Sequence, residues 1–295
     1  MEKVLEKEEK NAGGTREALK VAYYPGCSLN STAIDFNTSI KKLYGTLGVE
    51  LEEIEDWNCC GTTPAQNISR ELVSELSARN VRLAGKMGFS EILSPCISCY
   101  CKLFKAASGM KKAGEGDFKI FSIVEHLLFL KDIIAEKYAE NRGRIKPFEE
   151  NILNNLKPVC YYGCVLLRTE NIYRFDSFEN PTSMEKVLEA AGVNALNFSF
   201  KTECCGAILS LTHKEIVLKL SRKILDVAIE AGANSIITCC PLCQQNLDMR
   251  QSQINRYFKT NYKIPVFYIS QILGLALGIP FRELMINKLF VKPDF

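Results

Sequence analysis

Short apolar runs alternate along the chain with longer stretches in which apolar residues recur every three or four positions. The short runs predict buried strands, and the longer stretches predict amphipathic helices that cover them. In the first part of the chain we expect strands at residues 21–24, 49–54, 91–93 and 118–121. The helices expected beside them cover residues 32–47, 67–87, a stretch from about residue 100, and 123–138. This alternation predicts an α/β fold.

The same order restarts after a polar stretch, residues 137–157, which we interpret as a linker. We expect strands at 159–162 and 235–238, helices at 184–191 and 214–231, and a last pair of elements at 265–269 and 271–277. The predicted organisation is therefore a charged N-terminal tail over residues 1–20, a first domain over 21–148 and a second over 149–295.

An unusual motif supports an internal duplication. Asn58-Cys59-Cys60-Gly61 occurs again as Glu203-Cys204-Cys205-Gly206, and each copy is preceded by one cysteine and followed by a C-x-x-C pair. The offset is 137 residues for the first cysteines and 144 or 145 residues for the others. The matched pairs are Cys27 with Cys164, Cys59 with Cys204, Cys60 with Cys205, Cys96 with Cys240, and Cys99 with Cys243. Most of these cysteines follow a predicted strand, where open α/β sheets place their sites.

Composition narrows the functional classes. The chain of 295 residues has 13 cysteines, only two histidines and a net charge of +3, with basic and acidic residues mixed throughout. This charge pattern does not favour nucleic-acid binding. The first 20 residues lack the apolar core of a signal peptide, and the longest apolar run is too short to span a membrane. We therefore expect a cytoplasmic protein without a membrane span, whose cysteines serve metal or redox chemistry rather than disulfides.

Each half offers five thiols to one site. Structural zinc, which takes four thiolate ligands, is one interpretation. A thioredoxin-like dithiol is another, but two C-x-x-C copies that each accompany a double cysteine make it remote. Five thiolates suit a multi-iron cluster better, because one sulfur can bridge two irons, so we favour iron–sulfur clusters and keep zinc as the alternative.

The spacings C-x31-C-C-G-x34-C-x2-C and C-x39-C-C-G-x33-C-x2-C resemble the duplicated CCG domain in the B subunit of heterodisulfide reductase and its relatives. This resemblance implies that each set binds a noncubane [4Fe–4S] cluster. It also implies that the two clusters face each other and cleave a disulfide, or oxidise a thiol or persulfide, in one-electron steps. The ligands implied are Cys27, Cys59, Cys60, Cys96, Cys99, Cys164, Cys204, Cys205, Cys240 and Cys243.

The chain departs from that family near the second site. Ala207-Ile208-Leu209 follows the second Cys-Cys-Gly motif, where the methanogen proteins continue with glycines. Val165 and Gln244 follow Cys164 and Cys243, where those proteins have a histidine. A bulkier, more apolar cavity than that for the coenzyme M–coenzyme B heterodisulfide is expected. A heterodisulfide-reductase-like complex of sulfur metabolism, acting on sulfur held by a lipoate-binding carrier protein, is the preferred variant.

The chain contains no C-x2-C-x2-C-x3-C run of the ferredoxin type, so electrons must pass through a partner protein. The resemblance implies two partners, a ferredoxin-like iron–sulfur C subunit and a flavin-containing A subunit. One alternative is the CCG electron-transfer component of a lactate, glycolate or succinate–quinone oxidoreductase. Another is a non-catalytic metal-binding module for assembly or membrane docking, for which residues 271–277 are the only modest candidate.

Several other residues have no counterpart in the other half. We expect Cys101, Cys160 and Cys239 to be packed thiols. His126 and His213 are expected on a helix face or the surface, although His213 is close enough to the second double cysteine in sequence to be a weak candidate proton donor. We expect Arg168 and Lys201 to be solvated, and the pairs Tyr23-Tyr24 and Tyr161-Tyr162 to pack under the cysteine loops.

Overall fold

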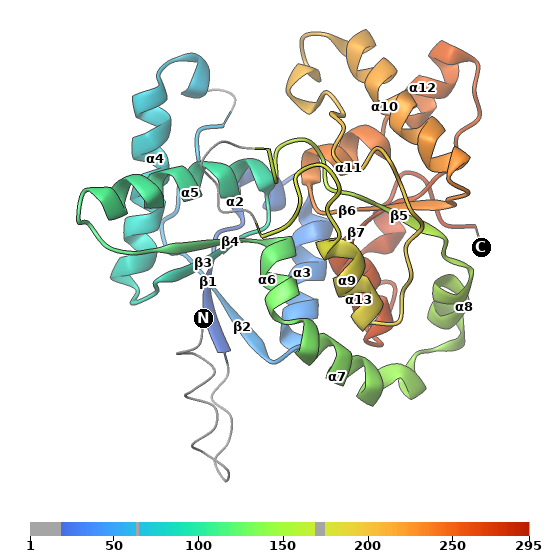
Figure 1. Cartoon of the computed structure of the whole chain (residues 1–295), viewed down its shortest axis with the longest axis horizontal. Coiled ribbons are helices and arrows are strands. Elements are labelled where there is room, and N and C mark those ends of the chain that lie inside the picture. The colour runs from blue at the N-terminus through green and yellow to red at the C-terminus, as the bar shows by residue number, and fades with distance from the viewer. Residues whose placement is uncertain (1–18, 63–64, 169–174, 295) are drawn as a thin grey trace.

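The computed structural model describes residues 19–62, 65–168 and 175–294. It contains two parallel sheets whose strands alternate along the chain with helices, which confirms the predicted α/β class (Figure 1). Most of the predicted tail lies outside the described residues; Leu19 and Lys20 already belong to the first strand. The two predicted domain boundaries stay predictions, and helix α8 (Pro147–Asn155) lies across the one between 148 and 149.

The first sheet has four strands in the order β2-β1-β3-β4. They are β1 (Leu19–Tyr23), β2 (Val49–Glu53), β3 (Glu91–Ser94) and β4 (Lys119–Ser122). Its helices are α2 (Gly26–Leu29), α3 (Ile34–Thr46), the 3-10 turn η1 (Ala65–Asn67), α4 (Arg70–Lys86), α5 (Ile97–Lys112), α6 (Ile123–Phe129) and α7 (Lys131–Asn141). The central strands bury their apolar residues on both faces, as parallel strands covered by helices do, whereas the edge strand β2 is glutamate-rich.

The second sheet has three strands in the order β5-β6-β7: β5 (Pro158–Tyr161), β6 (Ser235–Thr238) and β7 (Val266–Tyr268). Its helices are α9 (Ser183–Ala190), η3 (Ala207–Leu209), α10 (Lys214–Glu230), α11 (Pro241–Leu247), α12 (Gln251–Phe258) and α13 (Ile269–Ala276), and the turns η2 (Arg142–Arg144) and η4 (Ile286–Lys288) complete the elements. An isolated parallel bridge joins Leu196 to Val159 on β5. The bridge occupies the place that β2 has beside β1, so the second half repeats the order of the first.

The two halves share one interface. Helix α3 packs against α13, and α6 and α7 pack against α9, so that these helices lie between the two sheets (Figure 1). The rings of Phe36 and Tyr268 stack with centroids 4.1 Å apart, and the buried hydroxyls of Ser39 and Ser270 are 2.7 Å apart. Because α3 follows the first strand of its half and α13 the last strand of the other, these contacts join elements from both ends of the duplicated chain.

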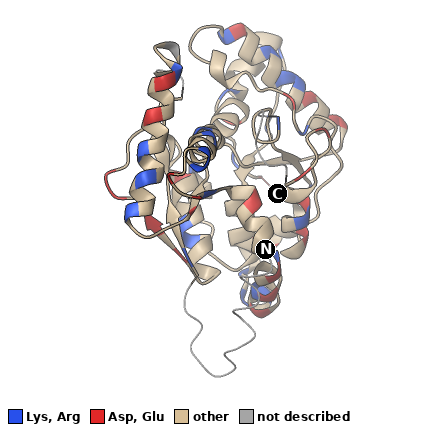
Figure 2. Ribbon diagram, turned by 60° about the vertical axis from the view of Figure 1, so that its left-hand side comes forward, with Lys and Arg blue, Asp and Glu red and all other residues tan. Residues whose placement is uncertain are grey.

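The distribution of charge agrees with the sequence, but one segment and one side chain expected to be exposed are buried. Basic and acidic residues are interleaved along the outer helices, in agreement with the sequence (Figure 2). However, every residue of α13 is buried, so the idea that residues 271–277 dock on a membrane is wrong. Lys201 is also buried rather than solvated: its Nζ lies 2.7 Å from Glu185 and donates to the carbonyl of Pro181 at 2.9 Å.

His126 is buried in α6, with 2% of its surface exposed, and is not a surface residue. Its Nδ1 lies 2.9 Å from the hydroxyl of Tyr44, and its ring packs edge-on against Phe121. Burial, with a smaller effect of the charge on Lys119, lowers the pKa of His126 to about 4. The imidazole is therefore neutral at pH 7 and serves packing between α3, β4 and α6.

Lowering the pH from 7 to 5 should remove a stabilising contribution of neutral His126 to the free energy of unfolding. Below pH 6.5 the unfolded chain binds a proton at this residue, whereas the folded protein does so only near pH 4. This difference removes about 2 kcal/mol of unfolding free energy at pH 5. In urea titrations, the change in the free energy of unfolding from pH 7 to pH 5 should be about 2 kcal/mol more favourable for His126→Gln, which keeps an acceptor for Tyr44, than for the unmodified protein. Glu125 and Asp248, whose pKa values burial raises to about 7 and about 6, act in the opposite direction but are present in both proteins. An equal change in both proteins would contradict the assignment.

Candidate iron–sulfur centres

The ten matched cysteines lie just after the carboxyl ends of strands or in the double-cysteine loops. Cys27 lies in α2 after β1, Cys96 is the residue before α5 after β3, and Cys240 holds the same place before α11 after β6. In a C-x-x-C pair at a helix start, the second cysteine sits on the first helical turn and its thiol turns back toward the first. Cys99 and Cys243 occupy that position.

The thiols approach one another in the same pairs in both halves. In the first half, Sγ of Cys59 lies 3.9 Å from Sγ of Cys27, and Sγ of Cys60 lies 3.4 Å from Sγ of Cys99. In the second half, Cys204 interacts with Cys164, and Sγ of Cys205 lies 3.5 Å from Sγ of Cys243. Cys96 and Cys240 interact with Cys99 and Cys243, respectively. Each set of five thus gathers at one place.

The electrostatics of the buried pairs also repeat. The hydrogen bond with Cys99 lowers the pKa of Cys60 to about 6, and the one with Cys243 lowers the pKa of Cys205. Thiolate is the form in which cysteine binds metal. In each set at least one buried sulfur therefore has a lowered pKa, which favours the thiolate form.

Glycines leave room for the sulfurs. Gly26 has a positive φ of +69°, and a Cβ on it would lie 2.9 Å from Sγ of Cys99. Gly163 has φ +73°, and a Cβ there would lie 3.0 Å from Sγ of Cys243. Both positions require glycine for two reasons: the backbone conformation and the close approach of the sulfur atom. A space that a single methyl group would close is present beside both thiols, and the all-sulfur donor sets have the soft-ligand chemistry that iron–sulfur clusters require.

Two of the four tyrosines predicted to lie under the double-cysteine loops support them, whereas the hydroxyls of Tyr23 and Tyr162 donate to Asn37 and Glu185 instead. The hydroxyl of Tyr24 donates to the carbonyl of Asn58 at 2.7 Å, and that of Tyr161 donates to the carbonyl of Glu203 at 2.7 Å. Within each loop the sulfur of the first cysteine accepts a backbone N–H, from Gly61 and from Gly206. Asn246, which no sequence pattern singled out, also supports the second loop and donates to the carbonyl of Cys205 at 3.1 Å.

Both sets lie near the interface between the halves. Burial raises the pKa of Tyr268, and the charges of Cys240 and Cys96 raise it further. One cysteine from each set is therefore within electrostatic reach of the same ring, the one that stacks on Phe36. Among the described residues, no three histidine, cysteine, aspartate or glutamate side chains are arranged to hold a single metal ion.

The three remaining cysteines and His213 do not belong to either five-cysteine set. Cys101, Cys160 and Cys239 are buried, and burial raises the pKa values of Cys160 and Cys239. His213 is exposed at the start of α10, where Nδ1 lies 2.9 Å from the hydroxyl of Thr212. In the described part of the chain it makes no hydrogen bond to a cysteine, and its role as a proton donor stays a prediction.

Comparison with known proteins identifies the family. Residues 21–104 and 159–248 match the cysteine-rich CCG domain, so the chain belongs to this family and contains two copies of the domain. The chain is 33% identical over 277 residues to the 8-methylmenaquinol:fumarate reductase membrane anchor subunit of Wolinella succinogenes, covering 90% of this chain and 95% of the relative.

Several further relatives are subunits of heterodisulfide reductases, and two of them are named as the B subunit or for their likeness to it. The chain is 27% identical to the B subunit of the ferredoxin:CoB-CoM heterodisulfide reductase of Methanosarcina mazei, over 91% of this chain and 93% of the relative. It is 28% identical to a protein of Archaeoglobus profundus that is named for its likeness to the heterodisulfide reductase B subunit, over 88% and 91%. These matches confirm the resemblance deduced from the motifs.

Among solved structures, a hypothetical protein from Helicobacter pylori has a TM-score of 0.67 at 14% identity, covering 95% of this chain. The chain spans about half of that longer protein, 53%, and the likeness shows the fold alone.

The expected cytoplasmic location is contradicted by the relative from Wolinella succinogenes, which carries the name of a membrane anchor subunit. In the parts of the chain that the structure describes, no helix combines the length and the apolar character needed to cross a membrane.

Proposed function

We propose that the chain is the iron–sulfur electron-transfer component of a multi-subunit oxidoreductase and that each five-cysteine set holds one noncubane [4Fe–4S] cluster. The observation that carries this proposal is the repetition of the same thiol pairs, with the same glycine beside them, in both halves. The proposed ligands are Cys27, Cys59, Cys60, Cys96 and Cys99 for the first cluster, and Cys164, Cys204, Cys205, Cys240 and Cys243 for the second.

Two clusters held in this way would each transfer one electron to or from a substrate that is oxidised or reduced by two electrons. The protein's own contribution is to keep the cysteine loops in place. Tyr24 and Tyr161 anchor the two loops, and the interface through Phe36 and Tyr268 fixes the halves relative to each other. Partner proteins, such as a ferredoxin-like iron–sulfur protein and a flavoprotein, would complete the electron path.

For the substrate we favour a membrane quinol over a disulfide. The relative with 33% identity is named for a menaquinol:fumarate reductase, and its whole length is nearly covered. In addition, the segment that follows the second double-cysteine loop exposes three apolar side chains, Ile208 (70%), Leu211 (96%) and Ile216 (43%), which we call the apolar corner. Exposed apolar patches of this kind mark surfaces for lipid or protein.

Disulfide or thiol chemistry is the second candidate, supported by the heterodisulfide reductase relatives at 27% and 28% identity. The two are separated by mixing the reduced, purified protein with a water-soluble naphthoquinone or with the CoB–CoM heterodisulfide in a stopped-flow instrument. Rapid reoxidation by the quinone alone is the expected result. Reoxidation by the disulfide alone would establish the second candidate instead.

Membrane docking through the apolar corner can be tested separately. On sedimentation with vesicles of phosphatidylethanolamine and phosphatidylglycerol, the double variant Ile208→Ser, Leu211→Ser should bind at least about tenfold more weakly than the unmodified protein, because each side chain stabilises the lipid-bound state by burial. Ile229→Ser is the matched control, since Ile229 is 47% exposed at the other end of α10. Equal binding by all three proteins would reject this docking surface.

A further inference from the structure

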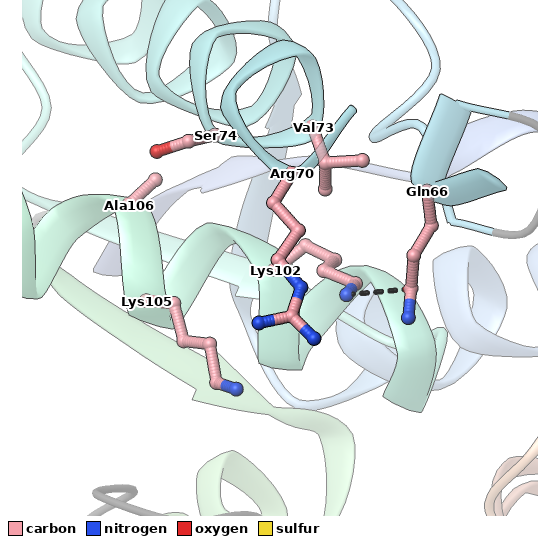
Figure 3. Close-up of a pocket in the computed structure, with 7 residues that line it drawn as sticks. All are labelled: Gln66, Arg70, Val73, Ser74, Lys102, Lys105 and Ala106. Atoms are coloured by element: carbon pink, nitrogen blue, oxygen red, sulfur yellow. Dashed lines mark hydrogen bonds between the residues drawn. The ribbon is translucent and has the colours of Figure 1, made fainter. Parts of the chain in front are cut away.

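A cavity of about 400 Å³ lies between the start of α4 and the middle of α5, and neither half's cysteine set includes it. Three cations line it: Arg70 from α4, and Lys102 and Lys105 from α5 (Figure 3). Figure 3 shows the guanidinium of Arg70 between the two lysine side chains. The polar side chains of Gln66 and Ser74 and the apolar side chains of Val73 and Ala106 complete the wall.

These cations lack acidic partners, unlike others on the same helices. Among the described residues, no carboxylate lies within ion-pair distance of any of the three, and Lys102 donates only to Oε1 of Gln66, at 2.9 Å. In contrast, Arg82 on α4 pairs with Glu115 at 2.9 Å, and Lys111 on α5 pairs with Asp117 at 2.6 Å. Glu71, beside Arg70, feels the charge of Arg70, but its carboxylate accepts from Ser69 and forms no ion pair with Arg70, so the cavity has an excess of positive charge.

The second half has filled the corresponding space. At an offset of 144 residues, Asn246 replaces Lys102, Met249 replaces Lys105, and Arg250 replaces Ala106. The guanidinium of Arg250 donates to Oδ1 of Asn246 at 2.9 Å and to the carbonyl of Ser210 at 3.4 Å. The basic cavity is therefore a property of the first half and not a consequence of the shared fold.

We propose that this cavity binds a small organic acid with two carboxylate groups. A guanidinium forms parallel hydrogen bonds with a carboxylate, and two lysines provide charge for a second one. Gln66 and Ser74 add hydrogen-bond donors, and the volume lies in the range of small-molecule sites. The occupant would lie beside Lys102, one helical turn beyond Cys99, and would change the charge next to the first centre. The proposal does not depend on the metal assignment.

The test is calorimetric titration of the purified full chain with succinate, with acetate and chloride as comparison anions. Succinate should bind at least tenfold more tightly than acetate. Its dissociation constant should rise at least tenfold in Arg70→Gln and in Lys102→Gln. Ala106→Leu, which narrows the cavity without adding charge, should weaken succinate binding at least tenfold.

Lys111→Gln, which removes a cation paired with Asp117 on the same helix, is the matched control and should bind succinate as the unmodified protein does. Melting temperatures establish that all variants are folded. Equal affinity for succinate and acetate, no succinate binding at millimolar concentration, or an equal loss in Lys111→Gln would overturn the proposal.

Discussion

Cys60→Ala is expected to remove about half of the iron and acid-labile sulfide from the purified chain and to leave the other half. Cys60 is buried, its Sγ lies 3.4 Å from that of Cys99, and the pKa of about 6 keeps it as thiolate. Its loss takes one anionic ligand from the first set and changes nothing in the second, which has its own five cysteines. Chemical analysis of iron and sulfide, with electron paramagnetic resonance, measures this loss.

The control for this variant is Cys101→Ala. Cys101 is a buried cysteine of the same half, two residues beyond Cys99, but outside the matched set. It should retain the full iron content. Full iron in Cys60→Ala, or an equal loss in Cys101→Ala, would contradict the assignment of ligands.

Gly26→Ala should also abolish the first centre, although it removes no ligand. The added methyl group would stand 2.9 Å from Sγ of Cys99, in a backbone conformation with φ +69° that costs an alanine about 1–2 kcal/mol. Either Cys99 moves out of place or the loop carrying Cys27 does. Iron should fall by about half, with a lower melting temperature, and Gly163→Ala should have the same effect on the second centre.

Gly109→Ala is the matched control, because Gly109 lies in α5 with open space where its Cβ would be. Alanine is favoured over glycine inside a helix, so stability should stay equal or rise by up to about 1 kcal/mol. If Gly26→Ala kept both its iron and its melting temperature, the close packing of backbone and sulfur would not be needed.

Much of the fold was readable from the sequence because its signals are local. The strand predicted at 235–238 is β6 (Ser235–Thr238), and the helix predicted at 214–231 is α10 (Lys214–Glu230). The helix predicted at 123–138 is instead broken at Leu130 into α6 and α7. Leu130 is no helix breaker by itself. Both pieces pack against α9, which is distant in sequence, and this contact between halves is invisible to a local pattern.

The candidate site shows the same division. The cysteine sets follow from a repeated motif, and the matched tyrosines Tyr24 and Tyr161 were detectable beside it. The basic cavity was not, because Gln66 and Lys102 meet across 36 residues. The sequence did contain one signal: at the offset of 144 residues between the halves, Lys102 is basic whereas Asn246 is neutral. The cytoplasmic location expected from the sequence was wrong, because hydropathy detects only segments that span a membrane.

The presence of two iron–sulfur clusters is tested most directly by metal analysis of the unmodified chain, purified without oxygen. We expect about eight iron atoms and as many sulfides per chain, four for each cysteine set, and little zinc. About one zinc ion for each half, with no acid-labile sulfide, would contradict it.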